Sequence, residues 1–208
     1  MTGPADRLTP AGYGTAEFVE KRSRFIGQVW RAESEAEAAE RVDSVRARHR
    51  GARHNCWCYL LSGGAERASD DGEPQGSAGV PMLEVFRRGG ITDVCCVVTR
   101  YFGGVLLGAG GLVRAYGRAA RLALDAAGVS RQTAFRVMRL RCSYKLAGRL
   151  IAEAELLGGT PDDTVYGTDV TMRVRIPEEH ANLFAARAAE ISADKAEIIF
   201  TGSAYAEA

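Results

Sequence analysis

The chain has 208 residues, of which 46% are hydrophobic and 25% are charged, values that are typical of a globular protein and exclude a wholly disordered chain. Lysine and arginine number 27, and aspartate and glutamate number 26, so the formal net charge is +1. This balance excludes a histone-like or polybasic binder, but it does not exclude a local basic patch.

The sequence indicates a cytoplasmic protein with no membrane partner. Its longest stretch without Asp, Glu, Lys or Arg covers residues 101–113 and contains five glycines, whereas a membrane-spanning helix needs about 18 apolar residues. The first ten residues lack the basic and apolar run of a signal peptide. The five cysteines, an odd number, lie inside apolar runs, which is typical of reduced thiols rather than of a disulfide framework.

The first part of the chain predicts a mixed α/β domain. Ser34 and Glu37 form a capping box that starts a helix to about residue 49, and the apolar run 94–99 is typical of a strand buried on both faces. In chain order we expect a hairpin over 15–31, that helix, a strand over 55–61, a polar loop over 62–79, a short helix over 81–87, the buried strand, a glycine loop over 102–111, and a helix from about Gly110 to residue 127.

The pattern changes after Gly128, and we place a domain boundary near Ser130. The expected elements are a strand over 135–142, a helix over 146–157, strands over 163–166 and 168–176, a helix over 177–191 and a strand over 197–201. Strand–helix–strand–strand–helix–strand is the order of a ferredoxin-like domain. The predicted fold class is therefore α+β, with domains over 1–130 and 131–208.

An acidic loop, Asp70-Asp71-Gly72-Glu73, places three carboxylates within four residues. Carboxylates are the ligands that Mg²⁺ prefers, but Asp-Gly and Glu-Pro are also ordinary turn pairs, and we favour a turn. Without a metal the charges need another partner, for which the sequence offers Arg53 or Arg100. We therefore predict no metal site and no cofactor.

The glycine loop follows the buried strand and leads into a helix that starts near Gly110. Backbone N–H groups and the helix dipole at such a point favour an anion. The segment is neither a P-loop nor a GxGxxG fingerprint. Close packing of the helix on the sheet, which only glycine permits, remains the alternative.

Arginines follow one face of this helix. Arg114, Arg118 and Arg121 are spaced at i, i+4 and i+7, which places them together on a helix. An ordinary solvated face explains the same spacing. Residues 1–131 carry 18 basic and 15 acidic side chains and the remaining 77 carry 9 and 11, so the excess of positive charge lies with the glycine loop.

A third segment places His54, Cys56 and Cys58 at the same parity of one strand. A nucleophilic Cys/His pair would need the two side chains to meet, but neighbours two apart on a strand usually point in parallel. No recognised metal spacing is present. We therefore interpret the cysteines as core residues and assign no catalytic residue.

Three motifs carry a resemblance to a known family. RHNCWCY, SDDGEPQGSAGVPML and VVTRYFGGVLLGAGGLVRAY resemble the YigZ/IMPACT family over residues 18–129. Ser77 stands where the family usually has threonine, and Cys58 where it usually has alanine. The resemblance implies an N-terminal domain like those of ribosomal proteins and elongation factor G, a ferredoxin-like second domain, and a role in translation or its regulation.

The family motif also implies a functional surface. Together with Arg118 of the arginine stripe, the predicted phosphate- and RNA-binding residues are Arg53, His54, Thr99, Arg100, Tyr101, Gly103, Gly104, Gly108, Gly110, Gly111, Arg114 and Tyr116. The resemblance counts the acidic loop in the same functional surface. Tyr101 and Tyr116 are expected either to stack on bases or to belong to the core.

These residues favour a non-enzymatic protein that associates with RNA or the ribosome. The first alternative is a Mg²⁺-dependent nucleotide-binding or phosphoryl-transfer enzyme, in which the acidic loop holds metal and the glycine loop holds phosphates. The second is a protein–protein regulator that contacts the translation machinery, since eukaryotic relatives bind a partner of the starvation-response kinase. The sequence does not place the two loops relative to each other, and it does not give an oligomeric state.

Overall fold

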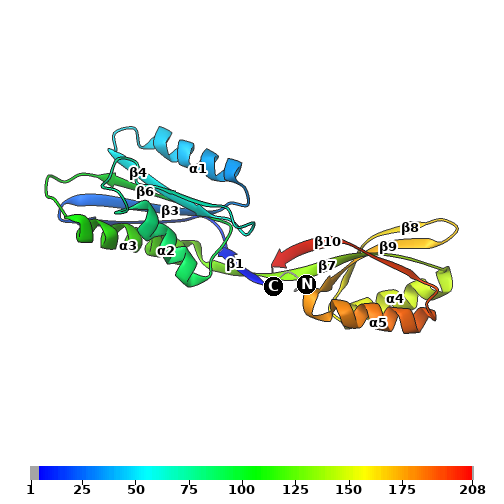
Figure 1. The fold of residues 1–208 in the computed structure, drawn as a ribbon. Helices are drawn as coiled ribbons and strands as arrows, with labels where there is room; N and C mark the ends of the chain where they lie inside the picture. The colour runs from blue at the N-terminus through cyan, green and yellow to red at the C-terminus, as the bar shows by residue number, and fades with distance from the viewer. Residues whose placement is uncertain (1–4, 208) are drawn as a thin grey trace. The chain divides into compact units, whose positions relative to one another are not determined.

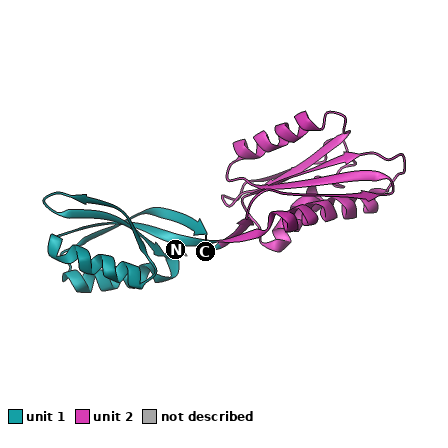
Figure 2. Ribbon diagram, turned by 180° about the vertical axis from the view of Figure 1, so that it is seen from behind, with its two compact units in different colours: residues 1–6, 132–208 teal, residues 7–131 magenta. Residues whose placement is uncertain are grey.

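The computed structural model describes residues 5–207 and divides the chain into two compact units. Unit 1 comprises Met1–Asp6 and Gln132–Ala208, and unit 2 comprises Arg7–Arg131 (Figure 2). Each unit has a sheet and a hydrophobic core of its own. The predicted α+β class is confirmed.

Unit 2 is built on a five-stranded antiparallel sheet. In spatial order the strands are β2 (Gly14–Glu20), β3 (Ser23–Arg31), β6 (Val94–Tyr101), β4 (His54–Leu60) and β5 (Glu66–Ser69). β5 lies inside the segment predicted as a loop, and β1 (Arg7–Pro10) was also not predicted. Both are four residues long, too short for a periodic pattern to be visible in the sequence.

Helices cover both faces of this sheet (Figure 1). α1 (Glu35–Arg48) packs on one face, and α2 (Gly79–Gly89) and α3 (Ala109–Ala127) pack on the other. Ser34 caps α1 as predicted, because its side chain accepts the Glu37 N–H. The central strand β6 is buried on both faces, since Val97 packs toward α1 and Val98 toward α2 and α3.

Unit 1 has the predicted element order. The elements are β7 (Val129–Cys142), α4 (Tyr144–Leu156), β8 (Thr160–Tyr166), β9 (Val170–Pro177), a short 3-10 helix (Glu178–His180), α5 (Ala181–Ser192) and β10 (Glu197–Glu207). In this five-stranded sheet β1 and β10 both pair with β7, and β9 and β8 follow on its other side; the β10–β7, β7–β9 and β9–β8 pairs are antiparallel. β7 and β10 are longer than predicted because they pair with each other along ten residues of β10.

α4 and α5 cover one face of the unit 1 sheet (Figure 1). Met138, Leu140 and Met172 point from the strands toward Leu150 and Phe184 of the helices, and all five are buried. Among the described residues, no helix combines the length and the apolar character that crossing a membrane requires.

Candidate functional site

The predicted site residues gather at one end of the unit 2 sheet. β4 begins at His54, which pairs in register with Arg100 near the end of β6. β3 begins beside the same end, where Arg24 pairs with Tyr101. α3 then starts at Ala109, after the loop that leaves β6. We call this part of the molecule the loop end of unit 2.

A buried ion pair attaches the acidic loop to the loop end. Glu73 Oε1 lies 2.7 Å from Arg100 Nη1, and the two side chains are 4% and 6% exposed. The Tyr116 hydroxyl donates to the same oxygen at 2.8 Å, and Arg100 Nη2 donates to Ser23 Oγ at 3.2 Å. Loss of one partner would leave the other charge buried without a counter-ion. The pair therefore holds the acidic loop against β6 and α3.

The interior next to this pair consists of neutral groups. Burial raises the pKa of the Tyr116 hydroxyl well above its usual value, and the neighbouring Cys56 and Glu73 add to the effect. Burial also raises the pKa of Cys56 to about 12, and its thiol contacts the Asp70 carbonyl at 3.0 Å. All five cysteines are free and buried. They are core thiols, as the sequence favours.

The Asp70 side chain caps the N-terminus of α2. Its carboxylate accepts hydrogen bonds from the backbone N–H groups of Gly76, Ala78 and Gly79 at 2.8 to 2.9 Å. Burial opposes ionisation, but these three donors outweigh it, and the pKa of Asp70 is lowered from its usual value. The negative charge also lies at the positive end of the helix dipole.

Asp71 joins the acidic loop to α1 and β4. Its carboxylate contacts Arg46 Nη2 at 2.9 Å and accepts the Asn55 N–H at 2.7 Å. His54 Nδ1 lies 2.8 Å from the Asp71 carbonyl oxygen. A carbonyl only accepts, so Nδ1 is the donor in this contact.

The three carboxylates therefore have different surroundings. The sequence offered Arg53 or Arg100 as arginine partners; Arg100 pairs with Glu73, whereas Arg46, which the sequence did not single out, pairs with Asp71. Within residues 5–207, no group of three or more His, Cys, Asp or Glu side chains is arranged to hold a metal ion.

Three residues that we predicted to contact RNA lie beneath the surface. Arg100 is occupied by Glu73, Tyr116 is fully buried, and the Thr99 hydroxyl donates to Asn55 Oδ1 at 2.8 Å inside the sheet. Their placement corrects the assignment of phosphate contact to Thr99 and Arg100, and it makes Tyr116 a core residue, the second of the two roles expected for it. They support the loop end from the interior.

The glycine loop needs its glycines for two different reasons. A Cβ on Gly103 would lie 1.9 Å from the carbonyl oxygen of Arg22, so the backbones approach too closely for any side chain. Gly108, the residue before α3, has a φ of +74°. Close packing of α3 on the sheet, which the sequence offered as the alternative for the glycine loop, is seen outside that loop, at Gly27 of β3, where a Cβ would lie 2.4 Å from the Ala119 carbonyl oxygen.

A pocket of about 270 Å³ opens beside the first turns of α3. It is lined by Phe18, Glu20, Lys21, Leu107, Gly111, Arg114, Ala115 and Arg118, and we call it the α3 pocket. The Arg118 guanidinium lies over the Phe18 ring at 4.4 Å. In the described part of the chain, Lys21 and Arg114 form no ion pair and no hydrogen bond with protein groups, and both are exposed.

The remaining predicted residues lie around this pocket or at the same end of the sheet. Gly104 and Gly110 are exposed, as is Arg53, which directly precedes β4. Tyr101 is half-buried, and its hydroxyl lies 2.9 Å from His49 Nδ1. Burial lowers the pKa of His49, and the nearby positive charges of two arginines lower it further.

Sequence reasoning missed two features of this surface. The turn between β2 and β3 adds two exposed cations, Lys21 and Arg22, next to the glycine loop. The glycine loop itself exposes Phe102, Val105 and Leu106, which are 42%, 37% and 80% accessible. A run of apolar residues between glycines was the available signal for the second feature.

Fold and site together define a two-unit α+β protein in which unit 2 carries the α3 pocket, lined by Lys21, Arg114 and Arg118. A family model described as the Impact N-terminal domain matches residues 21–124, and one described as a domain of unknown function, DUF1949, matches residues 140–195. The chain belongs to the IMPACT family, which confirms the resemblance stated from its motifs.

Relatives of similar length support this assignment. The chain is 37% identical over 187 residues to the IMPACT family member YvyE of Bacillus subtilis (strain 168), covering 89% of this chain and 86% of that protein. It is 35% identical over 201 residues to the IMPACT family member YigZ of Escherichia coli (strain K12), covering 92% and 96%. A crystal structure titled as a hypothetical protein is 33% identical, with a TM-score of 0.67 and coverage of 96% and 98%.

Proposed function

We propose that this protein is a non-enzymatic RNA- or ribosome-associated protein of the cytoplasm, with a role in translation or its regulation. The observation that carries the proposal is the group of cations around the α3 pocket. Lys21 and Arg114 are exposed without a protein partner among the described residues, and Arg118 has only the Phe18 ring. Exposed, unpaired cations in a shared pocket are what a phosphate backbone neutralises.

The start of α3 adds to this attraction. Gly108, Ala109 and Gly110 are exposed, so the first turn of the helix is accessible to a ligand. Free N–H groups and the helix dipole favour an anion there. The buried Glu73–Arg100 pair, with the Tyr116 hydroxyl on the same carboxylate oxygen, anchors the acidic loop to α3, the helix that carries Arg114 and Arg118.

The finer fold assignments are part of the same proposal. The βαββαβ order and the strand order of unit 1 support a ferredoxin-like domain. For unit 2 we propose the fold shared with ribosomal proteins and elongation factor G, which the family resemblance implies. Five free, buried thiols agree with a reducing compartment.

Binding of labelled ribosomal RNA at two salt concentrations tests the proposal. We expect affinity to fall steeply with salt, and Arg114→Ala to weaken binding of all sequences by about 3- to 10-fold while reducing the salt slope by about one. Arg67→Ala is the matched control, because Arg67 is exposed on β5 and pairs in register with Tyr59, away from the loop end. Weak binding without a salt slope would exclude nucleic acid as the ligand.

One observation favours a protein contact as a second candidate. The exposed Phe102, Val105 and Leu106 form an apolar segment beside the cations, and large exposed apolar side chains often mark protein interfaces. Repeating the binding assay with intact ribosomal subunits in place of naked RNA tests this second candidate. If a translation protein is bound, Leu106→Ser should weaken binding of the subunits but not of naked RNA; equal effects on both would contradict it.

A further inference from the structure

The α3 pocket carries more positive charge than one phosphate of an RNA backbone neutralises. Three cations, Lys21, Arg114 and Arg118, and one carboxylate, Glu20, line it, so the net charge of its lining is +2. Within residues 5–207, none of these cations forms an ion pair with Glu20 or with another carboxylate. A backbone phosphodiester carries a single negative charge. One such group in the pocket would therefore leave half of the positive charge uncompensated.

The three cations converge on the pocket from two elements. Lys21 belongs to the turn between β2 and β3, whereas Arg114 and Arg118 lie one turn apart on α3. The Arg118 guanidinium lies over the Phe18 ring at 4.4 Å, a contact that leaves its N–H groups available. A Cβ on Gly110 would lie 3.7 Å from Arg114 Nη1, so this guanidinium reaches back over the first turn of α3. The cations thus surround one pocket of about 270 Å³ and do not follow a strand.

The turn that presents Lys21 is made of residues that its backbone disfavours. Glu20 pairs in register with Ser23. Lys21 and Arg22 therefore form a two-residue loop, and their φ values are +45° and +64°. Asn-Gly is the pair that a hairpin loop with two left-handed residues prefers. A Cβ on Gly103 would lie 1.9 Å from the Arg22 carbonyl oxygen, so the turn packs tightly against the glycine loop. Two cations in place of the preferred residues indicate that this turn serves a ligand.

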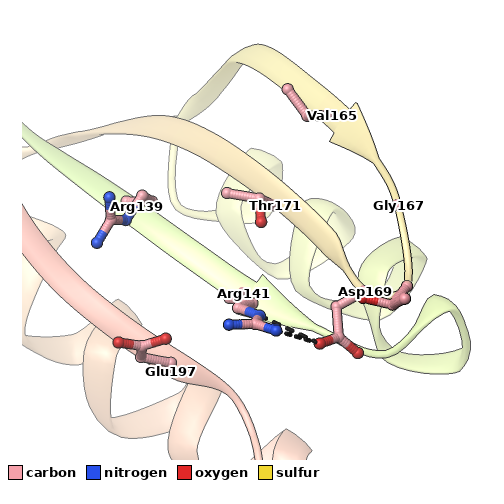
Figure 3. Close-up of a pocket in the computed structure, with 8 residues that line it drawn as sticks. Arg139, Arg141, Val165, Gly167, Asp169, Thr171 and Glu197 are labelled. Carbon is pink, nitrogen blue, oxygen red and sulfur yellow. Dashed lines mark hydrogen bonds and ion pairs between the residues drawn. The ribbon is translucent and has the colours of Figure 1, made fainter.

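A larger pocket in unit 1 gives the contrast (Figure 3). It measures about 460 Å³, and Arg139 and Arg141 line it. Asp169 and Glu197 line it as well, and Asp169 contacts Arg141 at 2.9 Å. The two positive and two negative charges of this lining sum to zero, so the pocket offers no net attraction to an anion. Size and the presence of arginine are therefore not what distinguishes the α3 pocket; its excess of cations is.

We infer that the α3 pocket binds a terminal phosphate monoester of RNA, an inference that rests on the proposed function and names the part of the RNA that is bound. A phosphate monoester carries a charge of about −1.5 to −2 at pH 7 and three acceptor oxygens. This charge matches the +2 of the pocket lining, and the three cations supply charged donors for the three oxygens. A phosphodiester inside the chain has a single charge. The pocket therefore distinguishes an end of the RNA from its interior.

Binding of a labelled oligouridylate of roughly twelve nucleotides to the full chain tests the inference. Three forms are compared at about 150 mM salt: one with a 5′-phosphate, one with a 3′-phosphate, and one with hydroxyl groups at both ends. We expect a phosphorylated form to bind about 10-fold or more tightly than the hydroxyl form, because it gains hydrogen bonds between charged groups. The form that gains affinity identifies the end. In Arg114→Ala this preference should fall to about 3-fold or less.

Lys21→Asn separates a ligand contact from a structural role. Asparagine tolerates the left-handed backbone of this turn better than lysine does, so the variant should lose the preference for phosphorylated RNA and unfold at an equal or higher temperature. Ala193→Asn is the matched control, because Ala193 is an exposed, uncharged residue with a φ of +48° at the end of α5 in unit 1. The control should retain the full preference. A lowered unfolding temperature in Lys21→Asn would assign Lys21 to the fold and contradict the inference.

The inference and the proposed function fail in different ways. Salt-dependent binding that is equal for the phosphorylated and hydroxyl forms overturns the inference and leaves the proposed function standing. Absence of salt-dependent binding of every form overturns both. Uridine monophosphate and a phosphoserine peptide are added as competitors. If either displaces the phosphorylated RNA at concentrations as low as the RNA itself requires, the pocket binds a free nucleotide or a protein, and the assignment to an RNA end is wrong.

Discussion

The two units use the same chemical pair in opposite ways. In unit 2, Glu73 and Arg100 meet at 2.7 Å with 4% and 6% of their side chains exposed. In unit 1, Asp169 and Arg141 meet at 2.9 Å, but 41% and 56% of their side chains are exposed. The two distances are similar, so burial decides how much each pair matters for stability. Loss of one partner is costly in the buried pair, whereas water replaces the lost partner in the exposed pair.

This difference explains how each unit presents its cations. In unit 2 the buried Glu73–Arg100 pair holds the acidic loop. Lys21 and Arg114 line the α3 pocket and have no protein partner among the described residues. Unit 1 keeps its arginines on an open sheet face, where Asp162 and Asp169 compensate part of the charge. We therefore expect mutations in the pairs to affect stability in unit 2 and to have little effect on stability in unit 1.

The largest effect is expected from Glu73→Ala. It leaves Arg100 buried without a counter-ion, which costs about 3–5 kcal/mol of unfolding free energy. Asp169→Ala, the control in unit 1, should cost about 0–1 kcal/mol, because solvent replaces the lost partner. Both tryptophans, Trp30 and Trp57, lie in unit 2, so their fluorescence in urea reports the first change; calorimetry reports the second. Equal losses in the two variants would contradict the role assigned to burial.

A smaller effect is expected from Gly103→Ala. Its Cβ would overlap the Arg22 backbone at the loop end, and such overpacking costs about 1–3 kcal/mol. Gly110→Ala is the matched control in the first turn of α3, where the nearest atom to a Cβ is 3.7 Å away. There alanine should be neutral or stabilising by up to about 1 kcal/mol. Urea unfolding followed by tryptophan fluorescence compares the two variants. If Gly110→Ala lowers the unfolding free energy as much as Gly103→Ala does, the space around the Cβ does not decide whether alanine is tolerated in this loop.

The parts of this structure that the sequence predicts are those with a local cause. The Ser34 cap, the apolar run of β6 and the glycine after α3 each mark an element within a few residues. β5 reads as polar loop, because only pairing with β4 makes it a strand. The βαββαβ order of unit 1 follows from alternating elements of ordinary length.

The site was predicted less completely, for a related reason. The motifs identify Glu73 and Arg100, but their contact joins residues 27 apart, and no local pattern shows that each satisfies the other. Arg100 was therefore offered both as a partner of the acidic loop, which the structure bears out, and as a phosphate contact, which it does not. The arginines of β7 and β9 were not singled out because the net charge of that half is slightly negative, and a sum does not show which side chains share a face.

The smallest effect is expected from the charge of Asp70, whose carboxylate accepts three backbone N–H groups at the start of α2. The pKa of Asp70 in the folded chain lies below its ordinary value of 3.8. Its carboxylate therefore contributes stability that is fully present above about pH 5, and that is lost as the pH falls through the folded-state value. Relative to Asp70→Asn, wild type should be more stable by about 1 kcal/mol at pH 7, since the ionised group accepts the backbone N–H groups of α2 more strongly.

This difference should shrink as the pH falls from about 5 to below 3.8. Urea unfolding at several pH values measures it, with Glu40→Gln as a control, since Glu40 is an exposed carboxylate of α1 without a described partner. A stability gap that stays constant with pH would mean that hydrogen-bond geometry, and not charge, holds the loop. Calorimetric titration of Mg²⁺ with ATP into the same variants adds a second readout. Because Asp70 already accepts three backbone donors, we expect no nucleotide binding that Asp70→Asn abolishes, and such binding would instead favour the Mg²⁺-dependent enzyme.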